Sequence, residues 1–158
     1  MRGTGGIAVH MLHRLLPFVL VACVEQPPPV DHTARRAAFH GELKKTLGTD
    51  WDAPAAQLLG SADTVAGQAL YTKSCGNCHG VELDGRGPRS GGMEPSPQAL
   101  VGPQAADLPP AAVLAIVRDG SPGTGMGPWR RAFSEEQIIN VVAYILDRRK
   151  GDSSGPPP

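Results

Sequence analysis

The sequence predicts a small helical domain, and three observations carry that prediction. Four stretches, at residues 33–47, 63–74, 109–119 and 134–150, have the apolar spacing or the end signals of helices. No βαβ pattern of alternating strands and helices accompanies them. A Cys-x-x-Cys-His motif at residues 75–79 follows directly after one of the four. The length of 158 residues suits one small domain with extensions.

The composition leaves little material for an ordinary hydrophobic core. The chain has 20 glycines and 16 prolines, which make much of it loop, and only 4% of its residues are aromatic. A large apolar cofactor would supply the missing core. The formal net charge at pH 7 is zero, which gives no electrostatic support for nucleic-acid binding.

The chain opens with the pattern of an export signal. Positively charged residues and histidines precede an apolar run at 15–22, which is too short to span a bilayer but has the length of a signal-peptide core. Met11 is an alternative start to Met1, because the residues from Met11 onward already make a complete signal. We therefore expect residues 1–22 to be a cleaved signal peptide.

The end of the apolar run resembles the lipobox of bacterial lipoproteins. It reads Leu20-Val21-Ala22-Cys23, and in a lipobox the cysteine becomes the new N-terminus and carries lipid on its sulfur. The alternative is ordinary cleavage nearby, which would leave Cys23 as a free thiol. Leu20 and Ala22 fit the small-residue pattern of ordinary cleavage poorly. We expect a lipid on Cys23 to attach the protein to a membrane.

The next segment, residues 23–60, is expected to be a lipid-anchored tether that contains a short helix. Prolines stiffen its start at 24–32. Apolar residues recur every four positions over 33–47, which predicts the helix. Residues 51–60 are expected to form an irregular connector.

The domain proper is placed at residues 61–150 and begins with the helix at 63–74. Gly67 and Tyr71 stand four positions apart, so they share one face of this helix. A second helix can cross closely over a glycine. We therefore expect such a crossing at Gly67, with the second helix meeting the ring of Tyr71.

This helix leads into Cys75-Gly76-Asn77-Cys78-His79, which is the pattern of covalent haem attachment. Two thiols about one helical turn apart can each add to a vinyl group on one edge of a porphyrin, and His79 would then bind the iron. A thioredoxin-like redox pair is one alternative, but it leaves the histidine unexplained. Half of a zinc site is another, but no second Cys/His cluster follows at usable spacing. We expect one haem on Cys75 and Cys78.

The chain's three cysteines are then all assigned, two to haem and Cys23 to lipid. Haem of the c type is attached outside the cytoplasm. The export signal and the haem motif therefore indicate the same extracytoplasmic, periplasmic location.

Two further helices follow. The helix over 109–119 has its prolines in the first turn, where they are tolerated. The helix over 134–150 starts with a capping box of Ser134 and Gln137 and ends with three basic residues. The remaining residues, 151–158, are expected to form a disordered tail.

Residues 120–129, between these two helices, are too rich in glycine and proline for regular structure. An iron bound to histidine requires a sixth ligand, and a methionine thioether suits electron transfer. Met126 lies in this loop, and we assign the ligand to it rather than to Met93. His32 and His40 are conceivable ligands, but we expect solvated histidines at both positions.

Residues 61–150 resemble a bacterial monohaem class I c-type cytochrome. The matching features are Gly67-x-x-x-Tyr71, the haem motif, Met126 in its glycine-rich loop and Tyr144 on the last helix. The stretch from Gly85-Arg-Gly-Pro88 through Met93-x-Pro95-x-Pro97-x-x-Leu100 also resembles a subgroup with a GxGPxxxxMxPxPxxL signature.

The resemblance implies an all-α fold in which three to four helices wrap around one covalently bound haem c, here with an N-terminal extension. It implies that the first and last helices cross at Gly67 and Tyr144. It also implies that the second imidazole nitrogen of His79 donates to the carbonyl of Pro88, which would fix the ring.

These features predict an electron carrier rather than an enzyme. Iron held by His79 and Met126 has no vacant position, which favours one-electron exchange with a protein donor and acceptor. One alternative is a haem subunit of a larger respiratory or dehydrogenase complex. Another is a haem enzyme or ligand sensor with a labile sixth ligand.

Overall fold

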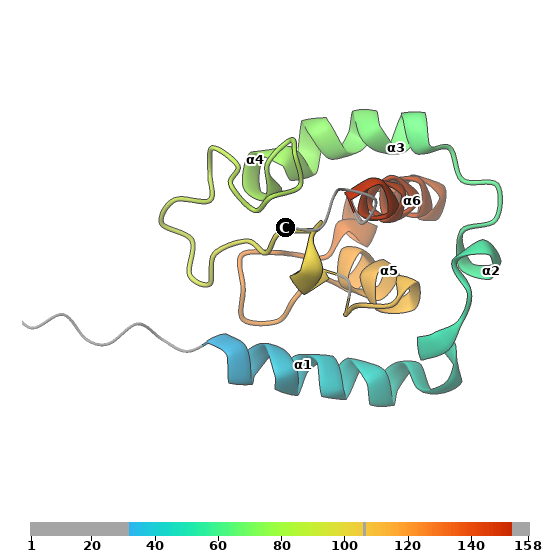
Figure 1. Cartoon of the computed structure of the whole chain (residues 1–158), viewed down its shortest axis with the longest axis horizontal. Coiled ribbons are helices and arrows are strands. Elements are labelled where there is room, and N and C mark those ends of the chain that lie inside the picture. Colours follow the sequence, from blue (N-terminus) through green and yellow to red (C-terminus); the bar gives the residue numbers. More distant parts are fainter. Residues whose placement is uncertain (1–31, 106, 153–158) are drawn as a thin grey trace, which may run out of the picture. The chain divides into compact units, whose positions relative to one another are not determined.

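The computed structural model describes residues 32–105 and 107–152 (Figure 1). The expected signal peptide, the lipid site at Cys23 and most of the proline-rich tether lie outside the described residues. The described part consists of helices and loops without a strand, which confirms the all-α fold.

The N-terminal extension contains more regular structure than the sequence predicts. The helix expected at 33–47 is α1 (His32–Leu47). It ends at Leu47, and Gly48 follows with a φ of 54° that is unfavourable for other residues. The expected irregular connector is instead a 3-10 turn, η1 (Gly48–Asp52), followed by the short helix α2 (Ala55–Leu59). Good helix formers after Pro54 explain α2.

The first helix of the domain, α3 (Thr64–Leu70), leads into the cysteine motif. The carboxylate of Asp63 caps it by accepting the backbone N–H groups of Val65 and Ala66 at 2.9 and 3.0 Å. The chain continues through a π-helical turn, η2 (Tyr71–Cys75), into α4 (Gly76–His79).

The last helix, α6 (Glu135–Asp152), crosses α3 (Figure 1), and Gly67 lies at the crossing. A Cβ atom on Gly67 would lie 2.6 Å from the carbonyl carbon of Asn140 and 3.1 Å from the Cβ atom of Tyr144. The rings of Tyr71 and Tyr144 meet beside this point, with centroids 5.4 Å apart. The predicted crossing is therefore confirmed.

The predicted capping box begins α6. The N–H of Ser134 donates to Gln137 Oε1 at 2.9 Å, and the N–H of Gln137 donates to Ser134 Oγ at 3.2 Å. The helix continues through Gly151 to Asp152, so these two residues belong to α6, and the rest of the expected tail lies outside the described residues. A glycine costs only about 1 kcal/mol in a helix, which does not force termination there.

The hydrophobic core lies between α3, α5 (Pro110–Asp119) and α6. Helix α5 contacts both α6 and α1 (Figure 1). Val113, Leu114 and Val117 of α5 are buried. Short 3-10 turns, η3 (Pro103–Ala105) and η4 (Trp129–Arg131), flank α5 on either side in the sequence. No helix in the described residues has the length and apolar character to cross a membrane.

Candidate haem site

The two motif cysteines lie in consecutive helical turns. Cys75 ends the π-helical turn η2, and Cys78 and His79 belong to α4. Both thiols are free and half-buried. Burial, with the nearby Cys78 as a smaller cause, raises the pKa of Cys75 to about 12, so it stays a neutral thiol until it reacts.

The loop after the motif holds this turn in place. The N–H groups of Gly85, Gly87 and Arg89 donate to the carbonyl oxygens of His79, Cys78 and Asn77 at 2.8, 3.2 and 2.8 Å, respectively. These donors satisfy carbonyl groups that the short helix α4 leaves unpaired.

Gly85 also lets the loop approach the segment at 97–99. Its φ is 79°, and a Cβ atom on it would lie 2.6 Å from the carbonyl oxygen of Pro97. The glycines of the GxGP signature therefore serve the packing of this loop.

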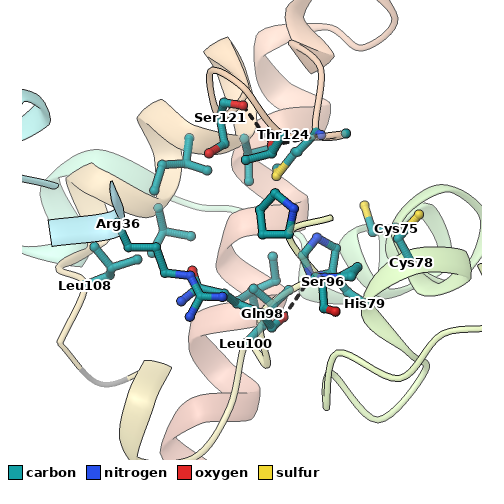
Figure 2. Close-up of a pocket in the computed structure, with 18 of the residues that line it drawn as sticks. Arg36, Cys75, Cys78, His79, Ser96, Gln98, Leu100, Leu108, Ser121 and Thr124 are labelled. Atoms are coloured by element: carbon teal, nitrogen blue, oxygen red, sulfur yellow. Dashed lines mark hydrogen bonds between the residues drawn. The ribbon is translucent and has the colours of Figure 1, made fainter. Parts of the chain in front are cut away.

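The imidazole of His79 is oriented by one hydrogen bond. Its Nδ1–H group donates to the carbonyl oxygen of Gln98 at 3.0 Å. The resemblance implied the Pro88 carbonyl as this partner, and the structure corrects that expectation. Pro88 is on the exposed loop, whereas the backbone at Gln98 lies beside the imidazole (Figure 2). Burial lowers the pKa of His79, which favours the neutral imidazole that a metal requires.

A single cavity joins the motif to distant parts of the chain. Its volume is about 210 Å³, and its walls are mostly apolar. Figure 2 shows Cys75, Cys78 and His79 on one side of it, with Arg36 and Leu108 on the other. The remaining walls come from α5, α6 and the loops at 93–98 and 121–129.

Both candidate methionines, Met93 and Met126, line this cavity. The backbone of Met126 is held on both sides, because its N–H donates to Thr124 Oγ1 at 3.1 Å and its carbonyl oxygen accepts the N–H of Ser121 at 2.9 Å. The terminal methyl of Met93 lies against Gly125, where a Cβ atom would be 2.6 Å from it.

The N-terminal extension also contributes to the cavity, which sequence reasoning missed. His32 and His40, expected to be solvated, are half-buried and line it together with Arg36. Burial is the largest cause of the lowered pKa of His40, and Arg36 adds to it. Arg149 of α6 lines the cavity as well. In a sequence, basic residues spaced along a helix indicate a solvent-exposed face. Only the packing of α1 against α5 shows that some of these residues line the cavity instead.

The residues around the cavity fit a covalently attached haem. Its walls offer two thiols, a neutral imidazole and thioether groups, and they include three arginines but no aspartate or glutamate. Haem is a flat apolar molecule with two carboxylates, so it matches these apolar walls and arginines. In the described residues, no three His, Cys, Asp or Glu side chains form a cluster that could hold a metal ion, so the zinc alternative finds no second ligand set there.

Comparisons with known proteins agree with this chemistry. Residues 62–145 match the family described as cytochrome C oxidase, cbb3-type, subunit III. The chain is 33% identical over 96 residues to cytochrome c55X of Stutzerimonas stutzeri, covering 61% of this chain and 69% of that protein. It is 32% identical over 120 residues to cytochrome c55X of Pseudomonas aeruginosa, covering 72% and 87%. It is 33% identical over 90 residues to cytochrome c-554(547) of Halothiobacillus neapolitanus, covering 54% and 96%.

A solved structure shares the fold. It is the reducing HAO-like protein complex of Kuenenia stuttgartiensis, with a TM-score of 0.50 and 27% identity. The match covers 60% of this chain and 46% of that one, less than half of its length. The motif, the cavity and these relatives together show that the chain belongs to the monohaem class I c-type cytochromes. These are electron-transfer proteins that carry one covalently bound haem c.

Proposed function

We propose that this chain is a one-electron carrier of an extracytoplasmic electron-transfer chain, with the haem iron held between His79 and Met126. The observation that carries the proposal is that both side chains line the same cavity as the two motif thiols. A bound haem supplies a reversible one-electron couple.

His79 is suited to the role of proximal ligand. Its Nδ1–H group is occupied by the Gln98 carbonyl, which leaves Nε2 as the nitrogen with a lone pair. A hydrogen bond of this kind also raises the basicity of the imidazole and keeps the ring from rotating. Both effects favour a ligand that stays in place as the iron changes charge.

Met126 is assigned as the sixth ligand, and Met93 as its packing partner. The two hydrogen bonds that hold the backbone of Met126 restrain its direction. The contact between Met93 and Gly125 places Met93 against the loop that carries Met126. With a thioether in the sixth position, small molecules such as oxygen find no open coordination site.

The test is the far-red methionine-to-iron charge-transfer band of the oxidised protein. We expect the band in the wild type and in Met93→Ala, and its loss in Met126→Ala. The Met126→Ala variant should also gain rapid binding of carbon monoxide in the reduced state. Rapid binding of carbon monoxide or cyanide by the wild type would instead indicate a haem enzyme or ligand sensor with a labile sixth ligand, and the carrier proposal would be wrong.

We also propose that Cys23 carries lipid and tethers the domain to a membrane, and that the electron donor and acceptor are proteins. The support is the lipobox at residues 20–23 and the proline-rich segment after it. A proline-rich segment is a semi-rigid spacer, which would hold the haem domain away from the bilayer and accessible to partners.

A second candidate is a haem subunit of a larger redox complex. The likeness to part of the reducing HAO-like protein complex favours it. Purification from detergent-solubilised membranes separates the two candidates. A free carrier should elute alone at the size of its own chain, whereas a subunit should elute with other redox proteins in fixed ratio.

A further inference from the structure

Helix α1 lies over the cavity although it precedes the part of the chain that matches the family. The family match begins at residue 62, whereas α1 ends at Leu47. His32, Arg35, Arg36, Phe39 and His40 all line the cavity from α1. The extension is therefore part of the wall of the haem site.

Two contacts hold the start of α1 against the loops that carry the methionines. The Nε2 atom of His32 pairs with the carboxylate of Glu94, the residue after Met93. The guanidinium of Arg35 lies against Gly123, so close that a Cβ atom there would collide with it. Helix α1 is thus positioned over both loops at once.

The wall of the cavity carries positive charge only. Among the lining residues there are arginines but no carboxylate. The Arg36 side chain extends from α1 into the cavity toward Gln98 and Leu100 (Figure 2). Within residues 32–105 and 107–152, its guanidinium has no ion-pair partner.

Arg149 reaches the same region from the end of α6. Its Nε–H donates to the carbonyl oxygen of Leu100 at 2.8 Å, and its Nη1–H donates to that of Leu108 at 3.1 Å. Leu100 and Leu108 line the same cavity as Arg36 (Figure 2). Burial lowers the pKa of Arg149, so an anion next to it would offset the cost of burying the cation.

We propose that Arg36 of α1 and Arg149 of α6 form the binding site for the carboxylate side chains of the haem. The inference rests on haem attachment at Cys75 and Cys78, and it makes α1 a part of the cofactor site. A guanidinium is suited to this role because its donors match a carboxylate in a two-point contact. With haem bound, two positive charges beside its carboxylates would disfavour the oxidised, more positive form of the iron.

The experiment measures the reduction potential of the full-length haem-loaded protein by spectroelectrochemical titration. Arg36→Gln and Arg149→Gln each remove one cation, Arg36→Lys keeps it, and Lys45→Gln is the control. Lys45 lies on the exposed face of the same helix and pairs with Glu42 at 3.3 Å. We expect both glutamine variants to lower the ratio of reduced to oxidised protein at a fixed electrode potential by roughly 3- to 10-fold. Arg36→Lys should lie near the wild type, and Lys45→Gln should match it.

An unchanged potential in Arg36→Gln, even with lower thermal stability, would give the arginine a merely structural role and overturn the proposal. If Arg149→Gln does not fold, the difference in reduction potential between Arg36→Gln and Arg36→Lys tests the proposal by itself. The far-red band, recorded on the same samples, keeps the two claims apart. Its absence from the wild type contradicts the assignment of Met126, while the potentials still test the arginines.

Discussion

Gly67 of α3 lies directly against the backbone of Asn140 on α6, so that a Cβ atom would sit 2.6 Å from the Asn140 carbonyl carbon. No rotamer relieves a collision between a Cβ atom and a backbone group. We expect Gly67→Ala to force the helices apart and to lower the free energy of unfolding by about 1 to 3 kcal/mol. Chemical denaturation of the haem-loaded protein measures it.

Gly41 supplies the control for this substitution. It lies inside α1, and a Cβ atom added to it meets nothing within 4 Å. Gly41→Ala should leave stability unchanged or raise it by up to about 1 kcal/mol, because alanine favours the helix. Equal effects of the two substitutions would contradict a specific close crossing at Gly67.

The hydroxyl of Tyr71 connects α3 to the haem motif. This fully buried residue donates to the carbonyl oxygen of Gly80 at 2.8 Å. Tyr71→Phe should cost about 1 to 2 kcal/mol of stability, because the carbonyl loses its donor in a buried place. Tyr144→Phe is the matched control, since the Tyr144 oxygen accepts only a longer contact of 3.2 Å from Arg148 in a less buried position.

The same residue predicts a dependence on pH. Burial is the largest cause of the pKa of Tyr71 being raised well above its usual range. The folded protein therefore keeps the proton after an unfolded tyrosine, with a pKa of about 10, has lost it. This contribution to stability is complete below about pH 10 and declines as the pH rises further. Denaturation of Tyr71→Phe between neutral and alkaline pH should show a shallower alkaline decline than the wild type, and an identical decline would count against this assignment.

Gly85 and Gly92 allow two effects of a glycine to be measured separately, namely its tolerance of a positive φ and the room that it leaves for a neighbouring segment. Both have positive φ, 79° and 88°, but only Gly85 has neighbours, because a Cβ atom on Gly92 meets nothing within 4 Å. Gly92→Ala should cost about 1 to 2 kcal/mol for backbone strain alone. Gly85→Ala should cost a further 1 kcal/mol or more, roughly, for the collision with Pro97. Thermal unfolding of both variants measures the difference, and equal costs would show that the loop does not need this close approach.

The proposed lipid anchor predicts where the protein is found after cell fractionation. Cys23→Ser should move the haem protein from the membrane fraction to the soluble extracytoplasmic fraction, because a hydroxyl cannot take the place of the lipidated sulfur. Haem attachment at Cys75 and Cys78 should be unaffected, which the absorption spectrum verifies. Continued membrane association of Cys23→Ser would contradict lipidation.

The sequence was sufficient for features that depend on neighbours along the chain. The capping box at Ser134 and Gln137 and the helix expected at 33–47 both follow from patterns within a few helical turns. The haem motif is equally local, because its two cysteines and its histidine lie within five residues. The crossing at Gly67 could be predicted as well, since Gly67 and Tyr71 share one helix face and a second helix can cross closely over a glycine.

Only the tertiary structure decided which groups surround the haem site. The partner of His79 is a backbone carbonyl, which every residue carries, so no side chain distinguishes Gln98 from Pro88 in advance. The polar residues of α1 look like a solvated surface until α5 packs beneath them. Arg36 and Arg149 are far apart in the sequence and reach one cavity only through that packing. The wall of a cofactor site is formed by residues that are far apart in the sequence. Their contacts produce no periodic pattern along the chain, so the sequence alone does not reveal them.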